Sequence, residues 1–166
     1  MKKLFIIIII FISFQSWTKA DDIKDFQIEG VSIGDSALDF YDVNKINSWK
    51  KIFYPGDVKF FKVDAPDAVG DYDDIGFHFK TNDSKFIIYE LSGGKYFENN
   101  ISKCMEHKRK INIDIKNITK NLEKSSYRYY YKYLEKGKSY ADIDDYYFTN
   151  GDAIRLWCVD WSDLVE

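Results

Sequence analysis

The sequence has little proline, glycine, cysteine or histidine: two prolines, nine glycines, two cysteines and two histidines in 166 residues. So few prolines and glycines exclude collagen-like, proline-rich and linker-dominated chains. Two cysteines cannot form a disulfide-dense miniprotein or a four-cysteine zinc site. Two histidines, His78 and His107, leave little room for a histidine-based metal site or a catalytic triad. We therefore expect no cofactor and no bound metal.

What the sequence does contain is typical of a small globular protein. Apolar residues make up 45% of the chain, charged residues 31% and aromatic residues 18%. This apolar fraction is too high for general disorder, and the length suits one domain better than two.

The first twenty residues have the layout of a secretory signal peptide. Lys2 and Lys3 precede an almost unbroken apolar run, Leu4–Phe14, and a polar stretch follows that ends at Ala20. Cleavage after Ala20 would leave residues 21–166, or 146 residues, as a single domain. The expected location is therefore periplasmic or secreted.

The alternative is that this segment stays uncleaved and anchors the chain in the inner membrane. A membrane-spanning helix needs about 20 apolar residues. The run here offers at most 14, even if Ser13, Gln15 and Ser16 are counted. We therefore expect contact with a membrane only if the segment is retained.

Charge is unevenly distributed along the mature chain. Its net charge is -6, yet residues 103–138 carry +7. One interpretation is a solvated basic helix packed near acidic loops of the same domain. The other is a basic face, with Lys108, Arg109 and Lys110 as candidate contacts, that docks on an unknown envelope protein or an anionic surface. The acidic total and the predicted export argue against nucleic acid as a partner.

Cys104 and Cys158 are the only cysteines, and export would place them where disulfides persist. We predict that they pair. Closing a loop of this length would stabilise the fold by roughly 4 kcal/mol in the chain-entropy model. The alternative is two buried free thiols. No C-x-x-C motif is present, so thiol-exchange activity is not indicated.

The strongest helical pattern runs from about Glu98 to Lys124. Its apolar residues recur at helical spacing and form one stripe, with Lys108 bridging the longest gap. The stripe consists of Ile101, Cys104, Met105, Ile111, Ile115, Ile118 and Leu122. The predicted disulfide would join this stripe to the end of the chain.

Short alternating runs bounded by turn residues predict strands elsewhere. The expected strands are Phe26–Val31, Val58–Val63, Ile75–Lys80, Lys85–Leu91, Asp144–Thr149 and Ala153–Trp161. Asn150-Gly151, between the last two, is a hairpin signal. The expected fold is therefore α+β: a small antiparallel sheet of about five strands packed against one long amphipathic helix.

Two short motifs suggest a serine hydrolase. Gly30–Gly34 matches G-x-S-x-G around Ser32, and Ser36 follows in a Gly-Asp-Ser segment. A serine nucleophile needs a histidine base, and neither histidine lies in a pattern that would supply one. We interpret the glycines as loop formers and Ser36 as a helix cap. The acidic segment Asp71–Gly76 fails the ligand pattern of a calcium-binding EF-hand, so no metal ligands are assigned.

Tyrosines alternate with other residues near the end of the basic region. Tyr127, Tyr129, Tyr131 and Tyr133 would share one face if this segment were extended. Tyrosine is common in protein interfaces, so these four residues are candidate interaction residues. The alternative is a strand or helical extension that covers the core.

The segment Ile28–Phe40, which reads IEGVSIGDSALDF, resembles a segment that follows the signal peptide in an uncharacterised family of short exported proteins from AT-rich marine bacteria. A cysteine in a lysine-rich helix and a late Cys-x-Asp-Trp-Ser, here Cys104 and Cys158–Ser162, are similar too. The resemblance implies export and a single domain. It implies no activity and supplies no catalytic residue.

These observations favour a non-catalytic periplasmic binding or protein-interaction module that uses the basic helix or the tyrosine segment. The alternative is a small serine hydrolase that uses Ser32 or Ser36. The lack of an evident base makes the first interpretation the stronger one.

Overall fold

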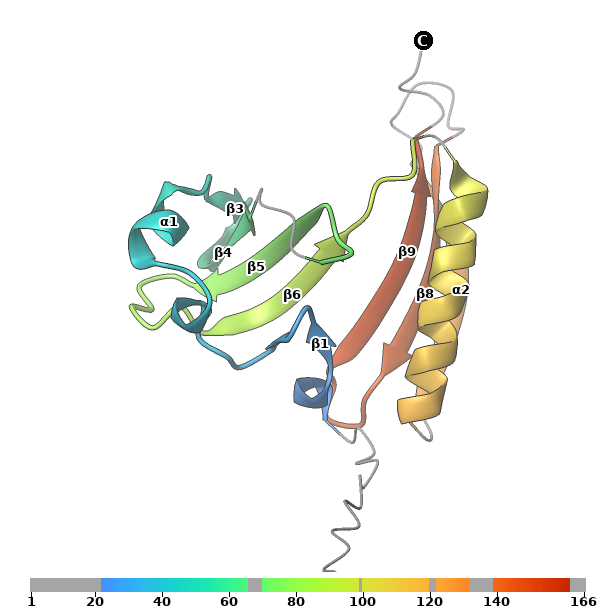
Figure 1. The fold of residues 1–166 in the computed structure, drawn as a ribbon, viewed down its shortest axis with the longest axis horizontal. Coiled ribbons are helices and arrows are strands. Elements are labelled where there is room, and N and C mark those ends of the chain that lie inside the picture. Colours follow the sequence, from blue (N-terminus) through green and yellow to red (C-terminus); the bar gives the residue numbers. More distant parts are fainter. Residues whose placement is uncertain (1–21, 66–69, 99, 120–121, 132–138, 162–166) are drawn as a thin grey trace, which may run out of the picture.

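The computed structural model describes residues 22–65, 70–98, 100–119, 122–131 and 139–161. In this part of the chain, nine strands form three antiparallel sheets of two, four and three strands. The two larger sheets lie side by side, and the long helix α2 (Ile101–Ile118) covers the face of the three-stranded sheet turned away from the other one (Figure 1). The predicted signal segment, residues 1–20, lies outside the described residues.

The four-stranded sheet has the order β3-β4-β5-β6. Its strands are β3 (Ile52–Tyr54), β4 (Asp57–Ala65), β5 (Asp74–Lys80) and β6 (Ile88–Gly94). The apolar residues of β4 and β5 alternate, so that Phe61, Val63, Phe77 and Phe79 are buried on one face. The opposite face is polar.

Five short N-terminal elements precede this sheet, and the last three cover its apolar face. They are η1 (Ile23–Asp25), β1 (Gln27–Ile28), β2 (Val31–Ser32), η2 (Ala37–Asp39) and α1 (Val43–Ser48). Ile46 and Trp49 pack into the core, and the Trp49 ring stacks on Phe77 at 6.0 Å between centroids. The expected strand Phe26–Val31 is broken in the middle, because Glu29 and Gly30 both have positive φ and form the tight turn between β1 and β2.

The three-stranded sheet consists of β7 (Glu123–Tyr130), β8 (Tyr140–Tyr147) and β9 (Ala153–Asp160), with β8 in the centre. All eight residues of β8 pair with both neighbours without a register shift. The hairpin predicted at Asn150-Gly151 is confirmed, and Gly151 adopts the positive φ that the turn requires. Tyr127 and Tyr129 therefore lie on a strand and not on a helical extension.

The predicted fold is wrong in its architecture. The chain is mostly β, with three sheets in place of one sheet of about five strands, and α2 packs on the three-stranded sheet alone. The four-stranded sheet instead buries its apolar face against α1 and η2. Periodicity identifies a strand but does not say which strands pair. The strand β3 was not predicted, and the segment of β7, which is exposed along its whole length, was left open between an extended and a helical form.

The long helix is also shorter than expected. It ends at Ile118, where the cap residue Thr119 is extended and its hydroxyl donates to the carbonyl of Ile115 at 2.6 Å. Leu122, predicted as part of the apolar stripe, therefore lies beyond the helix. Within the described residues, no helix is long and apolar enough to cross a membrane.

Candidate functional site

The predicted disulfide is confirmed. Cys104, in the first half of α2, is bonded to Cys158 near the end of β9, with 5.8 Å between their Cα atoms. Cys158 is buried and faces the helix, so its neighbour Trp157 lies on the opposite face of the sheet. The bond fastens α2 to an edge strand.

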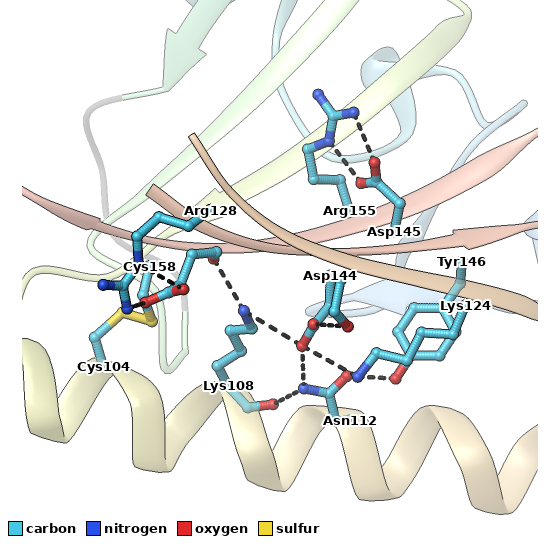
Figure 2. A network of polar contacts seen from close by, with 12 residues as sticks. Cys104, Lys108, Asn112, Lys124, Arg128, Asp144, Asp145, Tyr146, Arg155 and Cys158 are labelled. Atoms are coloured by element: carbon cyan, nitrogen blue, oxygen red, sulfur yellow. Dashed lines mark hydrogen bonds and ion pairs between the residues drawn. A yellow bond between two sulfur atoms is a disulfide. The ribbon is translucent and has the colours of Figure 1, made fainter. Parts of the chain in front are cut away.

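A polar network fills the space between α2 and the sheet (Figure 2). Asp144 of β8 points toward the helix and is only 6% exposed. It accepts hydrogen bonds from Asn112 at 2.8 Å and Ser126 at 2.6 Å. The Lys108 and Lys124 ammonium groups each lie 3.3 Å from the same carboxylate oxygen. Asp144 is thus a buried carboxylate with two cationic partners.

These contacts decide the charge of Asp144. Burial alone would raise the pKa of this carboxyl, but hydrogen bonds from Ser126 and Asn112 and the positive charge of Lys108 lower the pKa to about 2. Lys108 is itself buried, and its ammonium also donates to the carbonyl of Asp142 at 2.9 Å. The network is a structural support, because its members satisfy one another.

The next residue, Asp145, points to the other face of the sheet (Figure 2). It is 1% exposed, and Arg155 of β9 binds it through two hydrogen bonds of 2.7 and 2.9 Å. The hydroxyls of Tyr127 and Tyr147 donate to it as well. The Arg155 hydrogen bonds lower the pKa of Asp145. Asp145 thereby holds the Arg155 side chain against the face of the sheet.

A cleft of about 670 Å³ lies between the two larger sheets. The polar face of the four-stranded sheet supplies Lys62, Asp64 and Asp74, and β9 supplies Trp157 and Val159. Trp157 is 57% exposed, and Trp161 and Tyr96, which also line the cleft, are exposed too. The cleft therefore combines exposed aromatic rings with charged groups.

A smaller cavity of about 420 Å³ borders the network beneath α2. Met105, Lys108, Asn112, Arg128 and Asp144 are among the residues that line it. Arg128 is bound to Asp142 at 2.7 Å, and Lys108 and Asn112 are bound to Asp144. The polar groups of this cavity are thus already engaged within the protein.

The structure separates the three basic residues predicted as a docking face. Lys108 is buried in the network, whereas Arg109 and Lys110 are exposed. Lys110 pairs with Glu106 one helical turn away at 3.0 Å. Lys108 therefore contributes to the buried network, and of these three residues only Arg109 and Lys110 are accessible to a partner.

The tyrosine segment is extended over β7, which is the form in which its alternate tyrosines share one face. Tyr127 and Tyr129 lie on the same face of β7, and Tyr127 is in the same cross-strand row as Trp157. Tyr131 follows the strand, and its ring contacts Tyr129 and Trp161 at centroid distances of 5.2 and 5.0 Å. Tyr133 lies outside the described residues.

The two candidate serines serve the N-terminal loop. The Ser36 hydroxyl accepts from the amide of Leu38 and donates to the carbonyl of Lys85 at 2.6 Å, which makes it the cap of η2. Ser32 is buried, and its amide donates to the Asp35 carboxylate at 2.8 Å.

Within the described residues, no group of three or more histidine, cysteine or acidic side chains could hold a metal ion.

Sequence reasoning missed one cluster on the polar face of the four-stranded sheet. His78 lies between Glu90, at 2.9 Å from its Nδ1, and the Tyr54 hydroxyl, at 3.2 Å from its Nε2. The hydrogen bond from His78 lowers the pKa of Glu90, and the positive charges of Lys62 and Arg155 add to the shift. Alternation predicted that His78 faces away from the core, but its partners depend on strand register.

Sequence reasoning also missed the exposed Trp157 ring. The only sequence signal for its exposure was the alternation of side chains along β9, which places Trp157 on the face opposite the disulfide-bonded Cys158.

The chain matches no protein-family model, and comparison with curated proteins and with solved structures found no match. The resemblance of Ile28–Phe40 to exported marine proteins therefore stays a prediction.

Proposed function

We propose that the mature chain is an exported, non-catalytic protein-interaction module that binds its partner in the cleft between the two sheets. The observation that carries the proposal is the Trp157 ring, which is 57% exposed in a cleft of about 670 Å³. Tryptophan, tyrosine and arginine supply most of the binding energy of protein interfaces. All three types lie together on the face of the three-stranded sheet that carries Trp157, where Tyr127 and Arg155 are its neighbours.

Two contacts hold the binding surface in place, one on each face of β9. Cys158, next to Trp157, is bonded to α2, and Arg155 is fixed by Asp145. Binding costs less conformational entropy when the contact residues are already ordered. A rigid β9 therefore favours binding through the side chains that it presents to the cleft.

Export is supported by the predicted signal peptide and by the disulfide. Disulfides persist in the periplasm and outside the cell, and are rare in the cytosol. We infer a periplasmic or secreted protein, or one anchored at its N-terminus if the signal segment is retained. An envelope protein is then the expected partner.

A photoreactive phenylalanine analogue incorporated at Trp157 tests the location of the binding surface. We expect irradiation of cells to give one discrete adduct from this position and none from Ile113, a 53% exposed apolar residue of α2. The purified partner should then bind the unlabelled protein, and Trp157→Ala should weaken binding at least tenfold. An exposed tryptophan is suited to this test because its loss leaves the core intact.

The exposed basic residues of α2 provide the competing surface. The same analogue placed at Lys110 reports on the basic face predicted from the sequence. Adducts at Lys110 without adducts at Trp157 would show that the partner binds the helix and not the cleft. Equal adducts at Trp157 and Ile113 would show that the cleft has no specific partner.

A further inference from the structure

Strand β9 has one open backbone edge, and the cleft lies beside it. In the described part of the chain, β9 pairs with β8, and its residues 153–159 form backbone hydrogen bonds with no other segment. Trp157, Val159 and Asp160 of this strand line the cleft. We propose, building on the interaction function above, that the partner contributes an extended segment that adds to β9 as a fourth strand of this sheet.

The two edges of the three-stranded sheet differ in how they are protected. Exposed strand edges are usually blunted by charged side chains or proline, which discourage pairing with another chain. The other edge, β7, carries Glu123, Lys124 and Arg128. Before its last residue, β9 carries only one charged side chain, Arg155, and Asp145 holds that side chain against the sheet face. Lys124 and Arg128 of β7 are paired as well, with carboxylates of β8. The cleft-side edge carries two charged residues against three on β7 and is the less protected one.

Side chains of β9 offer apolar contacts to alternate residues of an added strand. Trp157 and Val159 are two residues apart and share the face opposite the helix. Directly paired residues of neighbouring strands contact one another on the same face. An incoming segment would therefore place every second side chain against the Trp157 ring and Val159. This requires an alternating apolar pattern in the partner.

The charge of the cleft indicates which charge the added segment should carry. Acidic residues outnumber basic ones among the described residues that line it. The lining contains Asp64, Asp74, Glu98 and Asp160 against Lys62 and Lys95. Asp64 is paired with Lys62 at 2.8 Å, and Asp74 accepts from the Tyr96 hydroxyl at 2.7 Å. An excess of carboxylates favours a segment with lysine or arginine between its apolar residues.

The test is a displayed library of ten-residue peptides with apolar residues at alternate positions and lysine, arginine or threonine between them. The library is selected against the disulfide-bonded mature protein. The best peptide is then synthesised in three forms: unmodified, and with backbone N-methyl groups on either the odd or the even residues. N-methylation removes the amide donors along one edge of an extended peptide without changing its side chains.

We expect one N-methyl isomer to bind at least 100-fold more weakly than the unmodified peptide, and the other to bind within threefold. Trp157→Lys, which adds a charge to this edge, should weaken binding at least tenfold. The matched variant Tyr130→Lys on β7 should not. Both positions are exposed, so equal unfolding midpoints of the two variants would confirm that the fold is retained.

Selection of no peptide, or equal binding of all three peptide forms, would overturn strand addition. This failure is distinguishable from failure of the proposed function. If Trp157 still gives a specific adduct in cells, the cleft binds its partner through side chains alone. If Trp157 gives no adduct and no peptide is selected, both proposals fail.

Discussion

Asp144→Ala is expected to lower the free energy of unfolding by about 3 kcal/mol, because it leaves Lys108 charged and buried beneath α2. The Lys108 ammonium would then retain only the carbonyl of Asp142 as a described partner. Removing one partner of a buried ion pair is far more costly than removing an exposed pair. Urea unfolding of the mature, disulfide-bonded protein measures the difference.

Asp142→Ala provides the matched control for this variant. Asp142 lies two residues away on β8 and therefore faces the same way, but its Arg128 partner is substantially exposed. We expect this exposed pair to contribute much less to stability than the buried one. Equal losses for Asp142→Ala and Asp144→Ala would contradict the account of the network.

Lowering the pH should reduce the free energy of unfolding for the same reason as Asp144→Ala, because protonation removes the charge of Asp144. Because the pKa of Asp144 is lowered to about 2 in the folded protein, the ionised carboxylate stabilises the fold at pH values above its ordinary pKa near 4. That stability is lost as the pH falls from about 4 to about 2. Asp144→Asn should therefore flatten this part of the stability profile.

Replacing both cysteines with alanine is expected to lower the free energy of unfolding by roughly 4 kcal/mol. The bond closes a loop with a sequence separation of 54 residues, and its removal frees the unfolded chain. Alanine is used because Cys158 is buried and a hydroxyl there would add a second penalty. Urea unfolding of the double variant measures the loss.

Reduced wild-type protein is the control for the double variant, because it loses the bond but keeps both sulfur atoms. The two should unfold at urea concentrations that lie close together and well below that of the oxidised protein. A double variant within 1 kcal/mol of the oxidised protein would show that α2 is held to β9 by packing and not by the bond.

Local features of the fold were predictable from the sequence. The disulfide followed from the presence of only two cysteines in a chain with a predicted signal peptide. The β8–β9 hairpin followed from Asn150-Gly151, since only a few residue types adopt the backbone that such a turn needs. Strands such as β5 followed from alternation, because Ile75, Phe77 and Phe79 all face the core.

Features that depend on pairing between distant segments were not predictable. Lys108 occupies a gap in the apolar stripe of α2, and its burial depends on a carboxylate 36 positions later on β8. The sequence shows the lysine but not the partner that neutralises it. In the same way, β7 is polar along the face that contacts the network, so its pattern did not decide between a strand and a helical extension.

The cleft was beyond sequence reasoning for a related reason. Trp157 and Asp64 line the same space, yet they belong to different sheets whose arrangement no local pattern specifies. Tyr127 and Tyr129, predicted as interaction residues, lie on the same face of the three-stranded sheet as Trp157, and their role stays a prediction. Trp157 was not among the predicted residues, because the pattern of residues 153–161 indicated a strand but not a binding surface.

Hydroxyl-radical footprinting in intact cells tests the central claim, that β9 binds a partner, most directly. The oxidation rate of Trp157 is compared with that of Phe53, a similarly exposed aromatic residue on β3, which is 54% exposed. We expect the ratio of the two rates to fall at least threefold in cells relative to the purified protein, because a bound partner covers Trp157 alone. The same ratio in cells and in solution would contradict the account.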